Sequence, residues 1–364
     1  MQTRSVQKIF RLVLVLANLL VALAFLASAC SDRIPPDKIL FFSYIGIIFP
    51  FLCLFNLGFM IYWICSRQWR YLLIGGLAFA LCWRPVRSYF PFHLHRNVPQ
   101  EKVIKVLTYN VMGFAYTSDK DGPNRILQYI ADSGADIVCL QEYFVSRSGN
   151  HLTAQEAATA LKAYPYVSVI KLKNFGWGLA VYSKYPITGS RRIEYDSESN
   201  GSSIHQIKIN GKTLTLINNH LESFKLTSKD KVRYLDFLKG AGPETFGGLR
   251  ATIQQKLGPA FLIRARQART VAQEIKQSRG DYLLVCGDFN DTPVSYAHRV
   301  VQGDLLDAFA ESGRGLGITY NLNYFWFRID HILYSSNMEA YQCTVDHVDY
   351  SDHYPVWCYL KLKD

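Results

Sequence analysis

The chain has 364 residues and a formal net charge of +11 at pH 7, and it is long enough for one large domain or two ordinary ones. Residues 1–100 hold ten Lys and Arg residues but only two acids, so the rest of the chain carries a surplus of only three positive charges. The basic character therefore belongs to the N-terminal part, and it gives no support to a DNA-binding function.

Three apolar runs fill this N-terminal part and predict a membrane region over residues 1–98. The first run, residues 9–29, has about the length of a membrane span and follows basic residues. The second, residues 39–65, carries no charge, and the third, residues 71–83, is shorter and flanked by tryptophans, which are common at membrane interfaces. We therefore expect about three transmembrane helices in a multi-pass membrane protein.

Basic residues at the N-terminus and in the loop after the second run favour a cytoplasmic position for both. Three crossings then place the rest of the chain on the extracytoplasmic (periplasmic) side of the membrane. Two alternatives stay open. A third run that only half inserts would leave the rest of the chain in the cytoplasm, and residues 1–29 would instead be a cleaved lipoprotein signal if cleavage occurs before Cys30.

From residue 101 on, apolar runs alternate with amphipathic stretches, which predicts a second domain of strands and helices over residues 101–364. Helices are expected over residues 123–133 and 153–163, the second opened by a capping box. The Asn210-Gly211 pair predicts a tight hairpin between two strands. Strands are expected over residues 102–108, 136–140, 166–170, 178–182, 203–209, 212–218, 281–286, 328–335 and 340–347.

Residues 224–280 interrupt this pattern with a stretch that is rich in Lys and Arg and helical in period. Its last helix is expected to carry Arg264, Arg266 and Arg269. The basic side chains face either solvent or, because the domain is tethered near a membrane, lipid headgroups. Both readings stay open.

The eight cysteines point neither to zinc nor to a disulfide framework. No CxxC or Cys/His spacing typical of a zinc site is present. Six of the cysteines lie in or beside apolar runs, where this residue is usually a small part of a core. Only Cys343 and Cys358 are placed so that they could pair.

Polar side chains follow several of the predicted strands. The clearest case is LLVCGDFNDTP at residues 283–293, where Asp288 and Asn290 come directly after an apolar run. One such residue is most often a turn former or a hydrogen-bonded surface group. Several in one domain favour a shared site, and the others are Asn110, Glu142, His220, Asp330 and His353.

The segments TYNVMGF, LQEYF, GWGLAVYSKYPI, NNHLES, GDFND, RIDHIL and SDHYPV stand in this order within residues 102–364. In this order they resemble the signature segments of the endonuclease/exonuclease/phosphatase superfamily. That group includes DNase I-like nucleases, abasic-site endonucleases, neutral sphingomyelinases and inositol polyphosphate 5-phosphatases. The resemblance implies an α/β (α+β) fold, a four-layer α/β sandwich of two central, mainly antiparallel sheets flanked by helices, here preceded by transmembrane helices.

The resemblance also implies a metal-dependent phosphoesterase site, with Mg²⁺ as the ion and Mn²⁺ as the alternative. Glu142 would be the principal metal ligand, with Asn110 beside it and Asp352 as a further ligand. The choice of ion agrees with these side chains, because Mg²⁺ prefers hard oxygen ligands and needs only one or two carboxylates beside the substrate phosphate.

The same resemblance implies the roles of the catalytic residues. Asp288 and Asn290 would position the attacking water and the phosphoryl oxygens, and His220 would contact the phosphate. His353 would pair with Asp330, since a carboxylate beside an imidazole fixes its tautomer and raises its basicity. Either this pair or Asp288 would take the proton of the water.

Two features depart from the family pattern. The segment 224–263 is longer than the compact core needs, and Tyr143 stands where an aliphatic residue is more usual. Neither touches the expected catalytic set, but both are candidates for altering substrate entry.

The sequence thus predicts a membrane-anchored phosphoesterase that cleaves phosphodiester or phosphomonoester bonds by metal-assisted attack of water. The expected partners are the bilayer and a phosphate-ester substrate, either a phospholipid or lipid-linked headgroup or a nucleic acid. No protein partner can be inferred. An extracytoplasmic Mg²⁺-dependent nuclease is the first alternative, and a catalytically inactive binding module on the same fold is the second.

Overall fold

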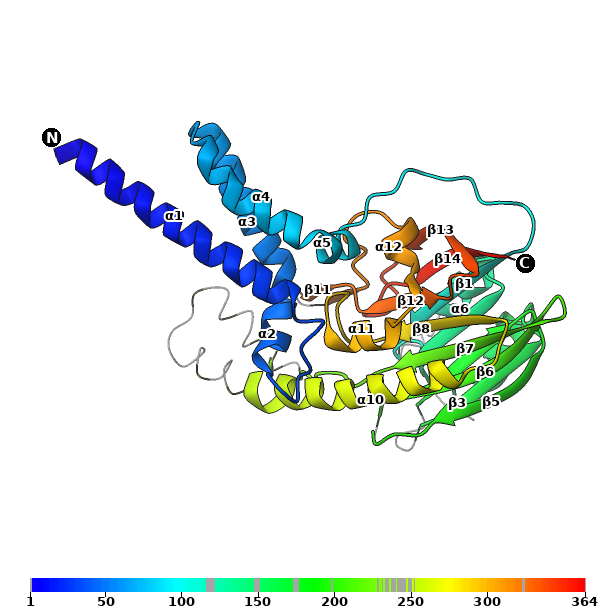
Figure 1. The fold of residues 1–364 in the computed structure, drawn as a ribbon. Helices are drawn as coiled ribbons and strands as arrows, with labels where there is room; N and C mark the ends of the chain where they lie inside the picture. Colours follow the sequence, from blue (N-terminus) through cyan, green and yellow to red (C-terminus); the bar gives the residue numbers. More distant parts are fainter. Residues whose placement is uncertain are drawn as a thin grey trace.

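The computed structural model describes residues 2–115, 122–146, 151–172, 177–197, 199–227, 253–322 and 325–363, with scattered residues between 229 and 251. The N-terminal part is helical, and the rest is built around two six-stranded sheets (Figure 1). Within the segment 224–263 that departs from the family pattern, residue 228 and most of residues 231–252 lie outside the described residues.

The N-terminal part contains one helix that is long and apolar enough by itself to cross a membrane, among the residues that the structure describes. This is α1 (Gln2–Ala29), whose apolar span Ser5–Ala29 has 25 residues. Two helices, α2 (Phe41–Ile47) and α3 (Phe49–Cys65), pass the same test only as a pair that bends by 62°. The remaining helices are a 3₁₀ turn (Trp69–Tyr71), α4 (Leu72–Leu81) and α5 (Trp83–Tyr89).

The bend between α2 and α3 corrects the expectation of one helix over residues 39–65. Pro50 lies in the first turn of α3. A proline has no N–H to donate and its ring clashes with the preceding turn, so it is tolerated at a helix start but not inside a helix. The apolar run therefore forms two helices rather than one straight span.

The first sheet has the strand order β13-β14-β1-β2-β4-β3, and the second has the order β5-β6-β7-β8-β12-β9. Each sheet contains one parallel pair, β1 with β2 and β7 with β8, and its other pairs are antiparallel. The strands are β1 (Val103–Asn110), β2 (Ile137–Tyr143), β3 (Tyr166–Lys171), β4 (Gly178–Ser183), β5 (Ile187–Ile193), β6 (Gly201–Ile209), β7 (Lys212–His220), β8 (Tyr282–Asp288), β9 (Leu306–Asp307), β12 (Asp330–Tyr334), β13 (Met338–Val345) and β14 (Val356–Leu362).

The two sheets face each other across an apolar core to which both contribute, for example Val106 of β1 and Leu284 of β8, each fully buried. The outer face of the first sheet packs against α6 (Arg125–Asp132) and α7 (Ala154–Ala160). The outer face of the second packs against α10 (Gly258–Gln277) and α11 (Tyr296–Gln302). The expected four-layer sandwich of two mixed sheets flanked by helices is confirmed.

Several local predictions are confirmed as well. The capping box forms between Thr153 and Glu156 at the start of α7. The Asn210-Gly211 hairpin has the two positive φ angles, 49° and 81°, that a tight turn of this kind requires. Cys343 and Cys358 are both buried free thiols. Strand β5 escaped prediction because it is a largely exposed edge strand, and so it lacks the alternation of a half-buried one.

Candidate active site

Five strands bring polar side chains to one mouth of the sandwich. In the second sheet, His220 at the end of β7 lies in register with Asp288 at the end of β8, which lies in register with Asp330 on β12. In the first sheet, Asn110 ends β1 beside Gln141 of β2, and Glu142 follows. Since β12 runs antiparallel to β8, Asp330 is the first residue of its strand, so the expectation that it ends a strand is wrong.

Asn110 joins the two sheets at this mouth. Its amide nitrogen donates to Glu142 Oε1 at 3.2 Å and to Asp288 Oδ2 at 3.1 Å, while its amide oxygen accepts the Met112 N–H at 3.1 Å. Asn110 is fully buried. Its single side chain therefore fixes the separation of two carboxylates that belong to different sheets.

Two histidines surround the buried carboxylate of Asp288. His353 lies between two acids, with Nδ1 at 2.9 Å from Asp330 Oδ2 and Nε2 at 3.7 Å from Asp288 Oδ2. His220 Nε2 is 3.6 Å from both Asp288 Oδ2 and Glu142 Oε1. The residue His353 precedes β14 rather than ending a strand, for the same topological reason as Asp330.

Glu142 on β2 and the loop after β8 both contain backbone conformations that are strained, and close contacts hold the loop in place. Glu142 and Asn290 both have φ of 51°, a region that residues other than glycine rarely adopt and that clusters at functional sites. The Asn290 N–H and side-chain amide donate to the two oxygens of Asp288 at 2.7 and 3.2 Å. Gly287 has φ of 128°, and a Cβ there would collide with the backbone of Asn219 on β7.

Burial and neighbouring charge shift the titration of this cluster. Burial raises the pKa of Asp288 to about 6, although the neighbouring histidines oppose the shift. Burial also raises the pKa of Glu142, and the nearby Asp352 carboxylate adds to that effect. Burial alone would lower the pKa of His353, but the carboxylates of Asp330 and Asp288 outweigh it and hold that pKa well above its usual value. Burial lowers the pKa of His220.

The donor set fits a divalent cation. One oxygen of the Asp330 carboxylate is buried and has no hydrogen-bond partner among the described residues. Asp288 and Asp330 each offer a carboxylate oxygen within 4.8 Å of the other, and Glu142 is partly exposed beside them. Carboxylates outnumber the cationic side chains at the mouth, and hard oxygen ligands of this kind suit a divalent cation.

Sequence reasoning missed the residues that hold the site loops from behind. Arg264 of α10 is fully buried, pairs with Asp291 Oδ2 at 2.8 Å and donates Nε–H to the backbone oxygen of Glu222 at 2.8 Å. Gln267, one turn further along α10, accepts the Glu222 N–H at 2.8 Å. The spacing of three residues puts both side chains on one helix face, and this was the available signal. Asp291 is thus a structural anchor rather than a residue of the mouth.

Two other sequence expectations concern residues near the site. Tyr143 is buried in the outer core of the first sheet, with its hydroxyl 2.8 Å from that of Tyr182, so it does not line the substrate entry. Of the basic residues on α10, Arg264 is buried and Arg269 binds Asp37 of the N-terminal part, so both are engaged within the protein. Arg266 is exposed.

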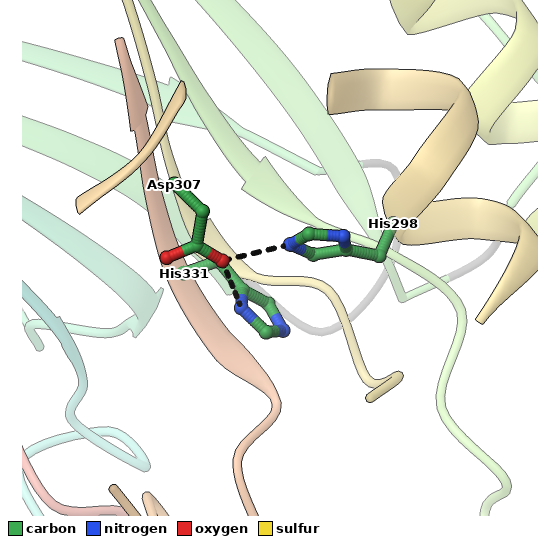
Figure 2. A group of neighbouring side chains, drawn as sticks. All are labelled: His298, Asp307 and His331. Atoms are coloured by element: carbon green, nitrogen blue, oxygen red, sulfur yellow. Dashed lines mark hydrogen bonds and ion pairs between the residues drawn. The ribbon is translucent and has the colours of Figure 1, made fainter. Parts of the chain in front are cut away.

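A second buried cluster lies behind the loop after β8, on the outer side of the sheet. His298 Nε2 is 3.1 Å from Asp307 Oδ2, and the ring of His331 approaches the same oxygen (Figure 2). His331 Nε2–H donates to the backbone oxygen of Asp291 at 3.0 Å. Because consecutive strand residues point to opposite faces, Asp330 faces the mouth while His331 faces this cluster.

The cluster balances its own charge. The Asp307 carboxylate also caps α12 (Ala308–Ser312) by accepting the N–H groups of Phe309 and Ala310. Burial would raise the pKa of Asp307, but the hydrogen bond from His298, the nearby ring of His331 and the charge of the buried Arg328 hold that pKa well below its usual value. The cluster of His298, Asp307 and His331 therefore connects α11 and α12 to the loop after β8.

The four-layer sandwich and the residues at its mouth are those of the DNase I-like α/β-sandwich class, which is a hydrolase fold. The endonuclease/exonuclease/phosphatase family model matches residues 107–353, and a model of a domain of unknown function (DUF8431) matches residues 8–89. The chain therefore belongs to the endonuclease/exonuclease/phosphatase family. Members of this family depend on divalent metal ions, and the fold is consistent with a phosphodiesterase, nuclease or phosphatase.

Solved structures share the fold at low sequence identity. An endonuclease/exonuclease/phosphatase from Bacteroides vulgatus is 20% identical, with a TM-score of 0.51 over 72% of this chain and 100% of that one. One from Beutenbergia cavernae is 16% identical, with a TM-score of 0.51 over 72% of each chain. D. rerio TDP2, complexed with a single-strand DNA product, is 16% identical, with a TM-score of 0.50 over 71% of this chain and 99% of that one. No curated protein matches the chain.

Proposed function

We propose that this chain is a membrane-anchored, divalent-metal-dependent phosphoesterase that hydrolyses a phosphodiester or phosphomonoester by attack of water. The observation that carries the proposal is the row of His220, Asp288 and Asp330 across three neighbouring strands, with His353 between the two acids. A buried acid next to an imidazole that a second acid holds in place can take and pass on a proton.

For the metal we propose Mg²⁺, with Mn²⁺ as the alternative. Glu142 and Asp352 would hold it, since the Glu142 side chain is 29% exposed whereas that of Asp288 is 1% exposed. When bound, the ion would neutralise charge on the phosphate and on the leaving oxygen. Asn110 would act mainly as a donor that orients Glu142 and Asp288, because its amide oxygen is already engaged by the Met112 N–H.

Asp288 is the group that we propose as the acceptor of the water proton. With its pKa raised by burial to about 6, it is ionised near neutral pH and still basic enough to accept a proton. His353 is held as a cation by its two acidic neighbours and would donate to a phosphoryl oxygen. His220, kept neutral by burial, would contact the phosphate, and Asn290 would hold Asp288 in place.

We propose that residues 1–98 form the membrane region and residues 101–364 the catalytic domain. In this reading residues 9–29, 39–65 and 71–83 make the three passes, the second through the bent pair of α2 and α3, and the domain lies on the extracytoplasmic side. Arg67 and Arg70 lie in the turn between α3 and α4, at the same end of the helices as the N-terminus (Figure 1). Basic residues at that end favour a cytoplasmic position for it, which supports this orientation.

For the substrate we propose a phospholipid or lipid-linked headgroup. The membrane region supports this choice, and so does the surplus of only three positive charges in the rest of the chain, because nucleic-acid binding draws most of its affinity from basic residues. A nuclease is the alternative, since D. rerio TDP2 has the same fold and is complexed with a DNA product. An inactive binding module is less well supported, because all the expected catalytic residues are present.

The test is hydrolysis of bis-p-nitrophenyl phosphate by the full chain in detergent, with Mg²⁺ and with EDTA. We expect activity only with the metal, and a loss of about 10²- to 10⁴-fold in Asp288→Asn, the range for removing a general base. Asp304→Asn replaces an exposed acid outside the site and serves as the matched control. Full activity of a folded Asp288→Asn variant would refute the proposal.

A further inference from the structure

The end of α1 is packed directly on the loop that carries the catalytic acid. The helix ends at Ala29, and two residues later Ser31 donates Oγ–H to the backbone oxygen of Val294 at 2.6 Å. Val294 is 3% exposed and belongs to the same apolar cluster as Phe25 of α1 and Phe49 of α3. The loop from Asp288 to Val294 is therefore continuous with the packing of the N-terminal helices.

Charge pairs reinforce this contact. Residues 1–100 contain only two acids, Asp32 and Asp37, and both bind arginines of the second domain. Asp32 lies 3.0 Å from Arg299 on α11, and both oxygens of Asp37 accept from Arg269 on α10 at 2.7 and 3.1 Å. Exposed pairs of this kind add little stability, but two of them at separate points restrict the orientation of the N-terminal region relative to the second domain.

A second attachment lies where the chain leaves the N-terminal helices. The fully buried Arg328 donates to the backbone oxygen of Ser88 at the end of α5 and to that of Leu316. Arg87 of α5 pairs with Glu311 of α12 at 3.3 Å. The N-terminal region is thus held at both of its ends, which removes the rotation that a single flexible linker would allow.

The chain length limits how far the site lies from the bilayer. A span of 25 residues is about 37 Å long at 1.5 Å per residue, which exceeds the roughly 30 Å of the hydrocarbon core, so α1 emerges among the headgroups. The six residue-to-residue steps from Asp288 to Val294 reach at most about 20 Å. The mouth therefore lies within about 20 Å of the headgroup layer.

We infer that the N-terminal region fixes the mouth of the site at the surface of its own bilayer, and that the substrate is a phosphate ester of a lipid in that same bilayer. The inference rests on the proposed hydrolytic function and on membrane insertion of α1. A substrate that diffuses freely in water needs no such fixed orientation, whereas a lipid reaches the site only if the mouth is held at its leaflet.

The test uses the full chain in vesicles of digalactosyldiacylglycerol, a bilayer lipid without phosphorus. In one arm a phospholipid extract is mixed into the same vesicles, and in the other it is added in separate vesicles at the same bulk concentration. ³¹P NMR follows the release of phosphorylated or phosphate products. We expect hydrolysis at least tenfold faster when enzyme and lipid share a bilayer.

A matched variant and two water-soluble substrates complete the experiment. Asp32→Asn/Asp37→Asn should slow lipid hydrolysis severalfold while leaving the rate on bis-p-nitrophenyl phosphate unchanged, and Asp304→Asn should change neither. Equal rates in the two vesicle arms, no lipid hydrolysis beside active cleavage of the soluble ester, or faster cleavage of a single-stranded oligonucleotide would each overturn the inference. Inactivity on every substrate would refute the proposed function instead.

Discussion

Replacement of Arg264 by methionine is the sharpest test of how the site loops are held. Arg264 is fully buried, and its ion pair with Asp291 and its bond to the Glu222 carbonyl connect the loops after β8 and β7. Methionine keeps much of the volume but leaves the Asp291 carboxylate, 7% exposed, without its counter-charge. Breaking one side of a buried ion pair costs about 3–5 kcal/mol.

In a domain of this size 1 kcal/mol shifts Tm by about 2–4 °C, so Arg264→Met should lower Tm by about 10 °C. We expect kcat to fall as well, because the loops that directly follow His220 at the end of β7 and Asp288 at the end of β8 both lose an anchor. Thermal unfolding of the full chain in detergent, monitored by intrinsic fluorescence, measures the first effect, and hydrolysis of a soluble ester measures the second. Arg266→Met, at an exposed position of the same helix, is the control.

A double-mutant cycle separates charge from packing. If an uncompensated carboxylate causes the loss, Arg264→Met/Asp291→Asn should be more stable than Arg264→Met alone, because the unpaired charge has gone. A change in Tm of less than about 2 °C in Arg264→Met, or simple addition of the two single effects, would refute the reasoning.

Three further predictions follow from the site. Because the folded-state pKa of Asp288 lies near 6 rather than at 3.8, the metal-free protein should lose about 3 kcal/mol of stability from this group as pH rises from 4 to 6, and the raised pKa of His353 adds a loss at higher pH. Tm in EDTA should therefore fall with rising pH, and added Mg²⁺ should raise Tm most at high pH. A rise of Tm with pH in EDTA would contradict this prediction. Gly287→Ala should fail to fold or lose about 3 kcal/mol or more of stability, since its φ of 128° and the nearby β7 backbone leave no room for a Cβ. Gly122→Ala, at a glycine with no atom within 4 Å and no positive φ, should have a much smaller effect in a thermal melt. His331→Ala should cost about 1–3 kcal/mol and lower kcat without moving the midpoint of the pH–rate profile, because His331 holds the Asp291 carbonyl from the cluster with Asp307 on the outer side of the sheet. A shifted midpoint would assign His331 a direct role in the reaction.

The sequence was sufficient to predict the catalytic domain and most of its site residues, but not the residues that hold the site loops in place. The alternation of apolar residues predicted most strands, and residues such as Asn110, Glu142 and His220 stood out because a polar side chain directly follows a buried run. Arg264 and His331 were harder to find, since a basic helix residue and a strand histidine usually face solvent or core. Only the packing of α10 on two loops, and the alternation of faces along β12, give these residues their roles.

The bend at Pro50 and the pairing of Asp32 and Asp37 were likewise invisible to a reading of hydropathy. A run of apolar residues predicts burial or membrane insertion, but it does not show where a helix breaks when no polar residue marks the break. The two acids looked like ordinary turn residues between apolar segments. Their role depends on Arg299 and Arg269, which lie more than 230 residues away in the chain.

In Sequence analysis, site residues were predicted where a polar side chain directly follows an apolar strand. The topology explains why this rule found the site but placed Asp330 and His353 at the wrong ends of their strands. Each sheet has one parallel pair, and the carboxyl ends of these four strands meet at the mouth with Asn110, Glu142, His220 and Asp288. Their neighbours β12 and β14 run the opposite way, so they must contribute from their amino ends, Asp330 as the first residue of β12 and His353, the sixth polar group, just before β14. In a mixed sheet, therefore, a functional residue that precedes an apolar run deserves the same weight as one that follows it.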